Sequence, residues 1–273
     1  MDIVVVLVPL FGVEGDARAL SAAYAIARKL NASVEALFVH RDPRETVLNV
    51  GEGASQNIID QLRRAVEAGD LRRRLARREF EAAQPAASGG AEGGLVASTW
   101  RELRDQDEQP GIALVRAARF ADLIVLPGPR GQSVLETLLL ESGRPLLLAP
   151  ATLPPSIGAN IAIAWSNTSA AIRAVCGAMP LLRAAKGIHV ITVGIDGASE
   201  LVGYLQRHGL GATAHSAPAD GAGGKVLLSK ARQLEADFLV MGGYGHSRFR
   251  ELVLGGVTRH VVAHADLPVI MAH

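Results

Sequence analysis

The sequence has little cysteine, few aromatic residues and almost no net charge. Cys176 is its single cysteine, which excludes an internal disulfide and a cysteine-based metal cluster. Aromatic residues make up 4% of the chain and hydrophobic residues 49%. This balance predicts an aliphatic core, as in parallel sheets covered by helices. We expect Cys176 to be a small buried side chain in that core.

The formal net charge of +1 gives no overall field that would attract nucleic acid or an acidic membrane. No stretch reaches the roughly 18 apolar residues of a membrane-spanning helix. The apolar residues 2–9 begin with an acid, lack a basic region and precede no small-residue cleavage site. We interpret them as a first strand and not as a signal peptide. We therefore expect a cytoplasmic protein with neither nucleic acid nor a membrane as partner.

What the sequence does contain is an internal repeat. The segment Phe120-Ala-Asp-Leu-Ile-Val matches Glu235-Ala-Asp-Phe-Leu-Val, and helical patterns precede both copies. Similar proline-marked apolar segments, 144–150 and 267–273, close the two halves. The segment between the halves is rich in proline and has no periodicity. We predict two domains, residues 1–151 and 158–273.

Each half alternates short apolar runs with helical patterns, which predicts βαβ units, a parallel sheet and an α/β fold. In the first half we predict strands at 3–8, 33–39, 95–100 and 123–126 and helices at 17–30, 55–83 and 111–120. In the second half we predict strands at 160–165, 188–193, 212–216, 238–241 and 267–271, and helices at 168–185, 199–208, 224–235 and 258–265.

Two features have a weak likeness to nucleic-acid-binding segments. Residues 71–80 include five arginines, but apolar side chains interrupt the arginines and nearby carboxylates offset them. We interpret this run as the solvated face of an amphipathic helix. Trp100, beside Arg101, could stack on a base, but we interpret it as an apolar anchor at the end of a strand.

The functional hypothesis depends on the glycine-rich segment after residues 238–241. Gly242 and Gly245 follow the predicted strand, and Gly255 comes after nine further residues, where a helical pattern begins. Glycines let a backbone approach an anion, and free N–H groups at a helix start point toward it. No Gly-Lys-Ser/Thr follows, which excludes a P-loop. The position late in the chain excludes the dinucleotide fingerprint.

This spacing resembles the nucleotide-binding motif of the universal stress protein family, G-x2-G-x9-G-(S/T). The flanking residues 245–248, 251–254 and 267–271 are similar to the family as well. The resemblance covers nearly the whole chain as two tandem domains. It implies a doubly wound, Rossmann-like fold of the adenine nucleotide alpha hydrolase-like type, with a five-stranded parallel sheet of order 3-2-1-4-5 in each domain. Ligands bind such sheets beyond the carboxyl ends of the strands, here between the first and the fourth.

The resemblance implies a site for ATP or AMP in the second domain, with or without Mg²⁺. The backbone N–H groups that would hold the phosphates belong to Gly242, Gly245, Gly255, Gly256 and Val257, and Thr258 would offer a hydroxyl. Trp165, Ser166 and Asn167 would lie across the crevice, and Val193 would meet the adenine. Arg248 and Arg250 either pair with phosphates or are surface charges.

Two departures from the family pattern predict a weakened or altered site. The family's Ser/Thr after the third glycine is Gly256 here, and the acid often found after the first strand is Ser166. A lost charge-assisted hydroxyl contact costs about 1–3 kcal/mol.

The first half departs further from the motif. It reaches Pro145 14 residues after Gly131, whereas the second half takes 23 residues from Gly245 to Pro268. The shortfall equals about two and a half turns of helix. Glu141 stands where a third glycine is expected, and its carboxylate would repel phosphate. Pro127 and Pro129 also remove backbone donors. We predict that this half keeps the sheet but lacks the phosphate site.

The sequence assigns no catalytic residue. It has no paired carboxylates, nucleophile elbow or Walker motif, so we expect at most weak ATPase activity. Adjacent loop residues such as His246 and Ser247 rarely form a base–nucleophile pair. His260 and His264 have a zinc-binding spacing but lack the glutamate of a metalloprotease motif. We interpret them as histidines near a helix C-terminus and assign no metal.

Three functions stay open: a nucleotide-binding stress sensor or regulator, a structural or partner-interaction module that binds no nucleotide, and a slow ATP hydrolase. The family associates through its last strand. The resemblance therefore implies an intramolecular pseudo-dimer, in which residues 146–149 pair with residues 267–271, and it is compatible with a further homodimer.

Overall fold

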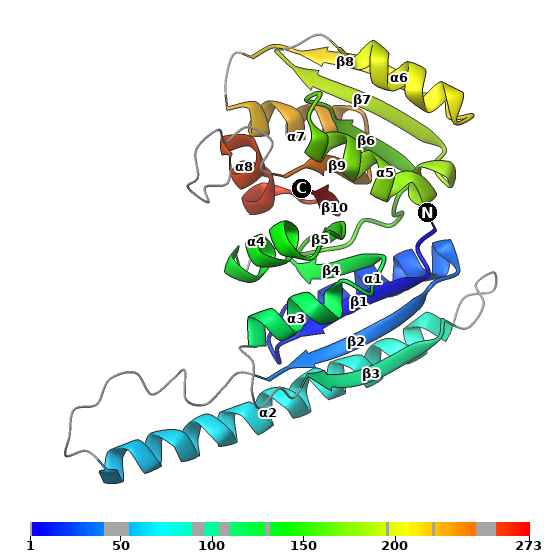
Figure 1. Ribbon diagram of the computed structural model, residues 1–273. Coiled ribbons are helices and arrows are strands. Elements are labelled where there is room, and N and C mark those ends of the chain that lie inside the picture. The colour runs from blue at the N-terminus through cyan, green and yellow to red at the C-terminus, as the bar shows by residue number, and fades with distance from the viewer. Residues whose placement is uncertain are drawn as a thin grey trace.

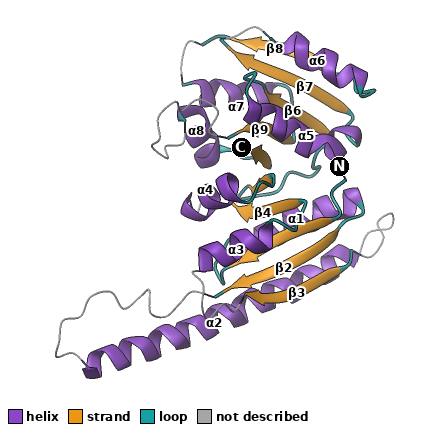
Figure 2. Ribbon diagram, viewed as in Figure 1, coloured by secondary structure: helices purple, strands orange, loops and turns teal. Residues whose placement is uncertain are grey.

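The computed structural model describes residues 2–40, 55–88, 96–103, 110–128, 132–194, 197–219, 222–243 and 255–273. Its strands form one sheet, and helices lie on both faces of that sheet (Figures 1 and 2). The first half contains β1 (Val5–Leu10), α1 (Asp16–Leu30), β2 (Ser33–Val39), α2 (Ser55–Ser88), β3 (Ser98–Leu103), α3 (Pro110–Ala118), β4 (Leu123–Pro127), α4 (Gln132–Glu141) and β5 (Leu146–Ala149). The second contains β6 (Asn160–Ala164), α5 (Ser169–Arg183), β7 (Gly187–Val193), α6 (Ala198–Arg207), β8 (Thr213–Ala217), α7 (Gly223–Gln233), β9 (Phe238–Gly242), α8 (Gly256–His264) and β10 (Val269–Ala272).

The ten strands run in the order β3-β2-β1-β4-β5-β10-β9-β6-β7-β8. Within each half all pairs are parallel, and each half has the order 3-2-1-4-5. The α/β fold and the strand order implied by the resemblance are therefore confirmed. The halves meet where β5 and β10 pair antiparallel, with Leu147 opposite Ile270.

The repeated aspartate has the same task in both halves. Asp122 Oδ2 accepts hydrogen bonds from the backbone N–H groups of Val4 and Val5, at 2.9 and 3.0 Å. Asp237 accepts from Ala159 at 3.0 Å and from Asn160 at 2.9 Å. Each carboxylate thus satisfies the backbone donors at the start of the first strand of its half. This explains why β1 begins at Val5, two residues later than predicted.

The third strand of the first half was also misplaced by the sequence pattern. We predicted residues 95–100, but β3 spans Ser98–Leu103. Its second half includes the charged residues Arg101 and Glu102, which break the apolar run, yet both have partners. Arg101 forms an ion pair with Glu35 of β2, and Glu102 accepts a hydrogen bond from the Trp100 indole. An edge strand can accommodate such side chains, and Trp100 itself packs near Phe38 and Phe80 as an apolar anchor.

The core is aliphatic, as the composition predicts, but Cys176 is not part of it. Valine, leucine, isoleucine and alanine make up most of the buried side chains on both faces of the sheet. On α5 the buried face includes Ala174, Val175 and Ala178, and Cys176 points away from it. Cys176 is exposed, with Sγ 3.7 Å from the Tyr204 hydroxyl. The prediction of a buried thiol is wrong because helical spacing places position 176 off the buried face.

No helix in the described ranges is both long enough and apolar enough to cross a membrane.

Candidate functional site

The start of α8 offers backbone donors that no side chain of the described residues caps. Its N-cap is Gly255, at φ −55° and ψ 149°, and α8 begins at Gly256. A Cβ at either glycine would meet no atom of the described residues within 4 Å, so these residues leave the space beside the two glycines open. The first N–H groups of a helix have no partner inside the helix. In the described part of the chain, the N–H groups of Gly256, Val257 and Thr258 have no backbone acceptor. These donors and the helix dipole together favour an anion.

Val193 and Val257 meet at this helix start, with Gly223 between them. A Cβ on Gly223 would lie 3.2 Å from Val257 Cγ2 and 3.9 Å from Val193 Cγ1. The end of β7, the start of α7 and the start of α8 therefore converge around one glycine. Of the predicted residues, the structure thus gathers Gly255, Gly256, Val257 and Val193. Thr258, in the same first turn, is buried, with 6% of its surface exposed.

Sequence reasoning missed the two glycines that begin α7. A Cβ on Gly224 would lie 2.6 Å from His260 Cβ and 3.0 Å from the Val257 carbonyl oxygen. Only a glycine lets the first turn of α7 approach α8 this closely. The adjacent pair Gly223-Gly224 at a predicted helix start was the feature that could have revealed the contact.

Gly242 faces protein rather than open space. A Cβ on it would lie 2.6 Å from the Ala171 nitrogen and 2.9 Å from the Ala170 carbonyl carbon. The glycine therefore allows the end of β9 to pack against the first turn of α5. Gly245, the pair His246 and Ser247, and the arginines Arg248 and Arg250 lie outside the described residues.

Residues 165–168 form the turn from β6 to α5. Thr168 is the N-cap of α5, and its hydroxyl accepts from the Ala171 N–H at 3.2 Å. The Ser166 hydroxyl lies 3.2 Å from that of Thr168, and Asn167 adopts a left-handed φ of 51°. These short polar side chains shape the turn at the carboxyl end of β6.

The Trp165 ring lies on the other face of the sheet from Val193. Trp165 belongs to the core cluster with Leu201 of α6, whereas Val193 packs against the cluster of α7 and α8. Trp165 also lines a small cavity of about 350 Å³ beside Ile172 and Tyr204. Its buried Nε1 has no hydrogen-bond partner in the described residues. The structure does not bring this side chain to Val257.

The first half has a helix, α4, in the place of α8, but the loop before that helix is short. Four residues, 128–131, join β4 to α4, whereas thirteen, 243–255, join β9 to α8. The whole shortfall therefore lies in the glycine loop. Glu141 is the last residue of α4, about 15 Å of helix from its start. Our expectation that Glu141 occupies the third-glycine position is wrong, because counting residues assumed a loop of equal length.

Pro127 takes the place in the first half that Gly242 has in the second. Both residues end the fourth strand of their half. A Cβ on Gly15, at the start of α1, would lie 2.6 Å from Pro127 Cβ. The glycine that allows this strand end and helix start to pack closely is Gly15 of the helix start in the first half, and Gly242 of the strand end in the second half. Pro129 and Gly131 lie outside the described residues.

A buried carboxylate already occupies the backbone donors after β1. Asp16 is fully buried, and its Oδ2 accepts from the N–H groups of Phe11, Gly12 and Val13 at 3.1, 2.7 and 3.3 Å. Burial raises the pKa of the Asp16 carboxyl to about 6, although these hydrogen bonds oppose the shift. The turn that corresponds to residues 165–168 is thus filled by the protein's own anion.

Because the pKa of Asp16 is raised in the folded protein, we expect the stability of the protein to fall as the pH rises. The pKa of this carboxyl is about 6 in the folded state against 3.8 in the reference state, so the folded state holds the proton more tightly. The contribution of this tighter proton binding to the free energy of unfolding is complete below pH 3.8. It is lost as the pH rises through about 6, where the folded protein also loses the proton. Asp16→Asn keeps an oxygen acceptor but cannot ionise. We expect the wild type to lose about 3 kcal/mol relative to Asp16→Asn between acid and neutral pH. Urea unfolding of both proteins across this range checks it, and parallel pH profiles would contradict it.

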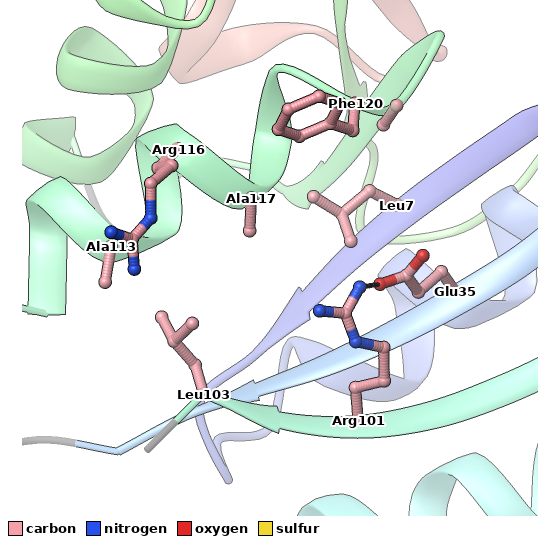
Figure 3. A pocket seen from close by; sticks show the side chains of 9 residues that line it. Leu7, Glu35, Arg101, Leu103, Ala113, Arg116, Ala117 and Phe120 are labelled. Atoms are coloured by element: carbon pink, nitrogen blue, oxygen red, sulfur yellow. Dashed lines mark hydrogen bonds and ion pairs between the residues drawn. The ribbon is translucent and has the colours of Figure 1, made fainter. Parts of the chain in front are cut away.

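A separate pocket of about 310 Å³ lies between α3 and the strands of the first half (Figure 3). Arg101 and Glu35, which form an ion pair, line it together with Leu7 and Leu103. Phe120, after the end of α3, is 84% exposed at its rim. This pocket shares no residue with the start of α8.

His260 and His264 interact with each other on α8. Their rings stack with centroids 4.3 Å apart, and the His264 Nδ1–H donates to the His260 carbonyl oxygen at 2.9 Å. Within the described residues, no group of three or more histidine, cysteine or acidic side chains could hold a metal ion.

Comparison with known proteins identifies the segment that carries this site. Residues 206–273 match the model of the universal stress protein family. The matched segment is the C-terminal part of the chain. It includes α7, β9, α8 and β10, and therefore the glycines of the candidate site. No curated protein matches the chain.

The whole chain is similar in fold to several solved structures, among them a universal stress protein. A universal stress protein from Archaeoglobus fulgidus DSM 4304 is 18% identical with a TM-score of 0.67, covering 98% of this chain and 97% of its own. A functionally unknown protein from Pseudomonas aeruginosa PAO1 is 16% identical with a TM-score of 0.54, covering 98% and 92%. At these identities the likeness is one of fold. It extends over both halves of the chain.

Proposed function

We propose that the second half binds an adenine nucleotide, ATP or AMP, and acts as a stress-response sensor or regulator rather than as a catalyst. The observation that carries this proposal is the start of α8, where the N–H groups of Gly256, Val257 and Thr258 have no acceptor among the described backbone groups and where no described atom fills the space beside Gly255 and Gly256. It lies within the segment that matches the universal stress protein family. The spacing Gly242-x2-Gly245-x9-Gly255 supports the same assignment.

In this proposal the phosphates lie at the start of α8 and the adenine beside the end of β7. The N–H groups of Gly256 and Val257 would donate to phosphate oxygens, and the dipole of α8 favours the negative charge. Val193 and Val257 present apolar surface at the carboxyl end of β7, as an adenine ring requires. Mg²⁺, where bound, would be held mainly by the phosphates themselves.

We further propose that residues 1–151 and 158–273 are two domains that form an intramolecular pseudo-dimer. The repeated strand order and the antiparallel pairing of β5 with β10 support this division. A contact across the pairing supports it as well, since a Cβ on Gly243 would lie 2.7 Å from Leu139 Cδ2 of α4. The connecting segment is held by Lys29, whose ammonium donates to the Gly158 carbonyl oxygen at 2.6 Å.

Isothermal titration with ATP and with AMP, each with and without Mg²⁺, tests the nucleotide proposal. Saturable binding of one nucleotide per chain is the expected result. The absence of binding at millimolar nucleotide would overturn the proposal and favour a partner-interaction module of the same fold. Measurable turnover of the bound ATP would instead favour the slow hydrolase.

Restoring the hydroxyl that the family pattern has at position 256 should tighten binding. The described residues leave room for a serine side chain there, because none of their atoms lies within 4 Å of an added Cβ. We expect Gly256→Ser to lower the Kd for ATP on the order of tenfold, through one hydrogen bond to a charged phosphate. Gly256→Ala is the matched control, since it adds a Cβ without the hydroxyl. Equal affinities of the serine and alanine variants would show that position 256 does not contact phosphate.

A further inference from the structure

The groove between α2 and the edge strand β3 carries an excess of arginine. Its lining consists of Arg73, Arg74, Arg77, Arg78 and Glu81 of α2 with Trp100 and Glu102 of β3, and its volume is about 430 Å³. Four guanidinium groups face two carboxylates there. The chain as a whole is almost neutral, so this concentration of one charge is local. Such a groove favours an anionic ligand.

Two of the arginines are held in place by neighbouring side chains. Arg77 Nε lies 2.7 Å from Glu81 Oε1, and its guanidinium carbon lies 5.1 Å from the centroid of the Trp100 ring. Arg73 Nη1 lies 3.6 Å from Glu102 Oε1, which also accepts from the Trp100 indole. The two glutamates therefore orient Arg73 and Arg77 and neutralise part of their charge.

The other two arginines have no such partner. Arg74 and Arg78 are exposed, and the described part of the chain provides neither with an ion pair or a hydrogen bond. They are four residues apart on one helix, so their side chains lie about 5–6 Å apart at Cβ. Guanidinium groups bind phosphate oxygens in a bidentate manner. The pair can therefore hold two neighbouring phosphate groups of one ligand.

The aromatic ring in the groove is not available for stacking on a base. Trp100 is stacked with Phe38 at 6.1 Å between centroids, and Arg77 lies over the same indole. Phe80 packs near it at 5.7 Å. The groove thus recognises charge rather than a nucleobase, which argues against single-stranded nucleic acid as the ligand.

We propose that this groove is a second ligand site, for compounds with two or more linked phosphate groups, and that Arg74 and Arg78 are its main contacts. The site is independent of the start of α8. Strands β2, β1, β4, β5 and β10 separate β3 from β9 in the sheet, and Figure 1 shows α2 and α8 in opposite halves of the molecule.

Titration of the full chain with inorganic tripolyphosphate tests the proposal. We expect saturable binding that weakens about tenfold or more in the double variant Arg74→Gln/Arg78→Gln. Arg63→Gln/Arg64→Gln is the matched control, because it removes the same charge from exposed positions of the same helix. Arg74→Lys/Arg78→Lys should recover part of the affinity. Because all four positions are exposed, the thermal transitions should stay close to that of the wild type.

Three results would overturn the proposal. One is an equal loss of affinity in the two glutamine double variants, which would indicate a general effect of charge. Another is tripolyphosphate binding that Gly255→Asp abolishes and Arg74→Gln/Arg78→Gln leaves intact, which would place the anion at α8. The third is tighter binding of a single-stranded oligonucleotide than of tripolyphosphate at the same ionic strength.

Discussion

Gly255→Asp should abolish ATP binding while leaving the protein at least as stable as the wild type. Aspartate is among the best N-cap residues, and an added Cβ meets no atom of the described residues within 4 Å at this position. Its carboxylate would accept hydrogen bonds from the first N–H groups of α8 and would repel phosphate. We expect the Kd to rise by about a hundredfold or more, because donors are lost and a like charge is added. Titration calorimetry and thermal unfolding of the same preparation measure both effects.

The matched control is Gly111→Asp, which adds the same charge near the start of α3 in the first half. An added Cβ at Gly111 also meets no atom of the described residues within 4 Å. This variant should bind ATP like the wild type. If Gly255→Asp retained the wild-type affinity, the phosphates would not lie at the start of α8.

Gly242→Ala should destabilise the protein by about 2 kcal/mol, because its Cβ overlaps the backbone of α5. The Ala171 nitrogen would lie 2.6 Å away, and backbone cannot move aside as the end of a side chain can. Gly211→Ala is the control, since it meets no atom within 4 Å, and its change should stay within about 0.5 kcal/mol. Urea unfolding compares the two. An unchanged midpoint for Gly242→Ala would mean that β9 and α5 are less closely packed than the structure shows.

The sequence predicted the alternation of strands and helices but not the order of the strands. Apolar runs such as residues 238–241 coincide with all but the last residue of β9, because a strand buried on both faces needs a continuous apolar segment. The order 3-2-1-4-5 came from the family resemblance alone. The position of β3 was predicted wrongly because Arg101 and Glu102 are charged and gain their partners only when the strands are paired.

The candidate site was predictable only where its residues follow one another in the chain. The glycines at 255 and 256 stand out in the sequence, but the contact of Gly223 with Val193 and Val257 depends on tertiary packing. The contacts of Gly15 with Pro127 and of Gly242 with Ala171 also depend on the fold. In the first half the glycine lies at the start of the helix, and in the second half it lies at the end of the strand. The prediction for Glu141 was wrong because the sequence shows only that the first half is shorter. It does not show that the missing residues belong to the loop before α4.

We expect phosphate to bind to the backbone N–H groups at the start of α8. The most direct test is a ¹H–¹⁵N spectrum of the labelled protein during addition of ATP. We predict that the amide resonances of Gly256, Val257 and Thr258 shift progressively and saturate, with Gly223 also affected and the amides of α4 unchanged. If the resonances of residues 256–258 stayed unchanged while those of other amides shifted to saturation, the nucleotide would bind elsewhere, which would contradict a phosphate site at α8.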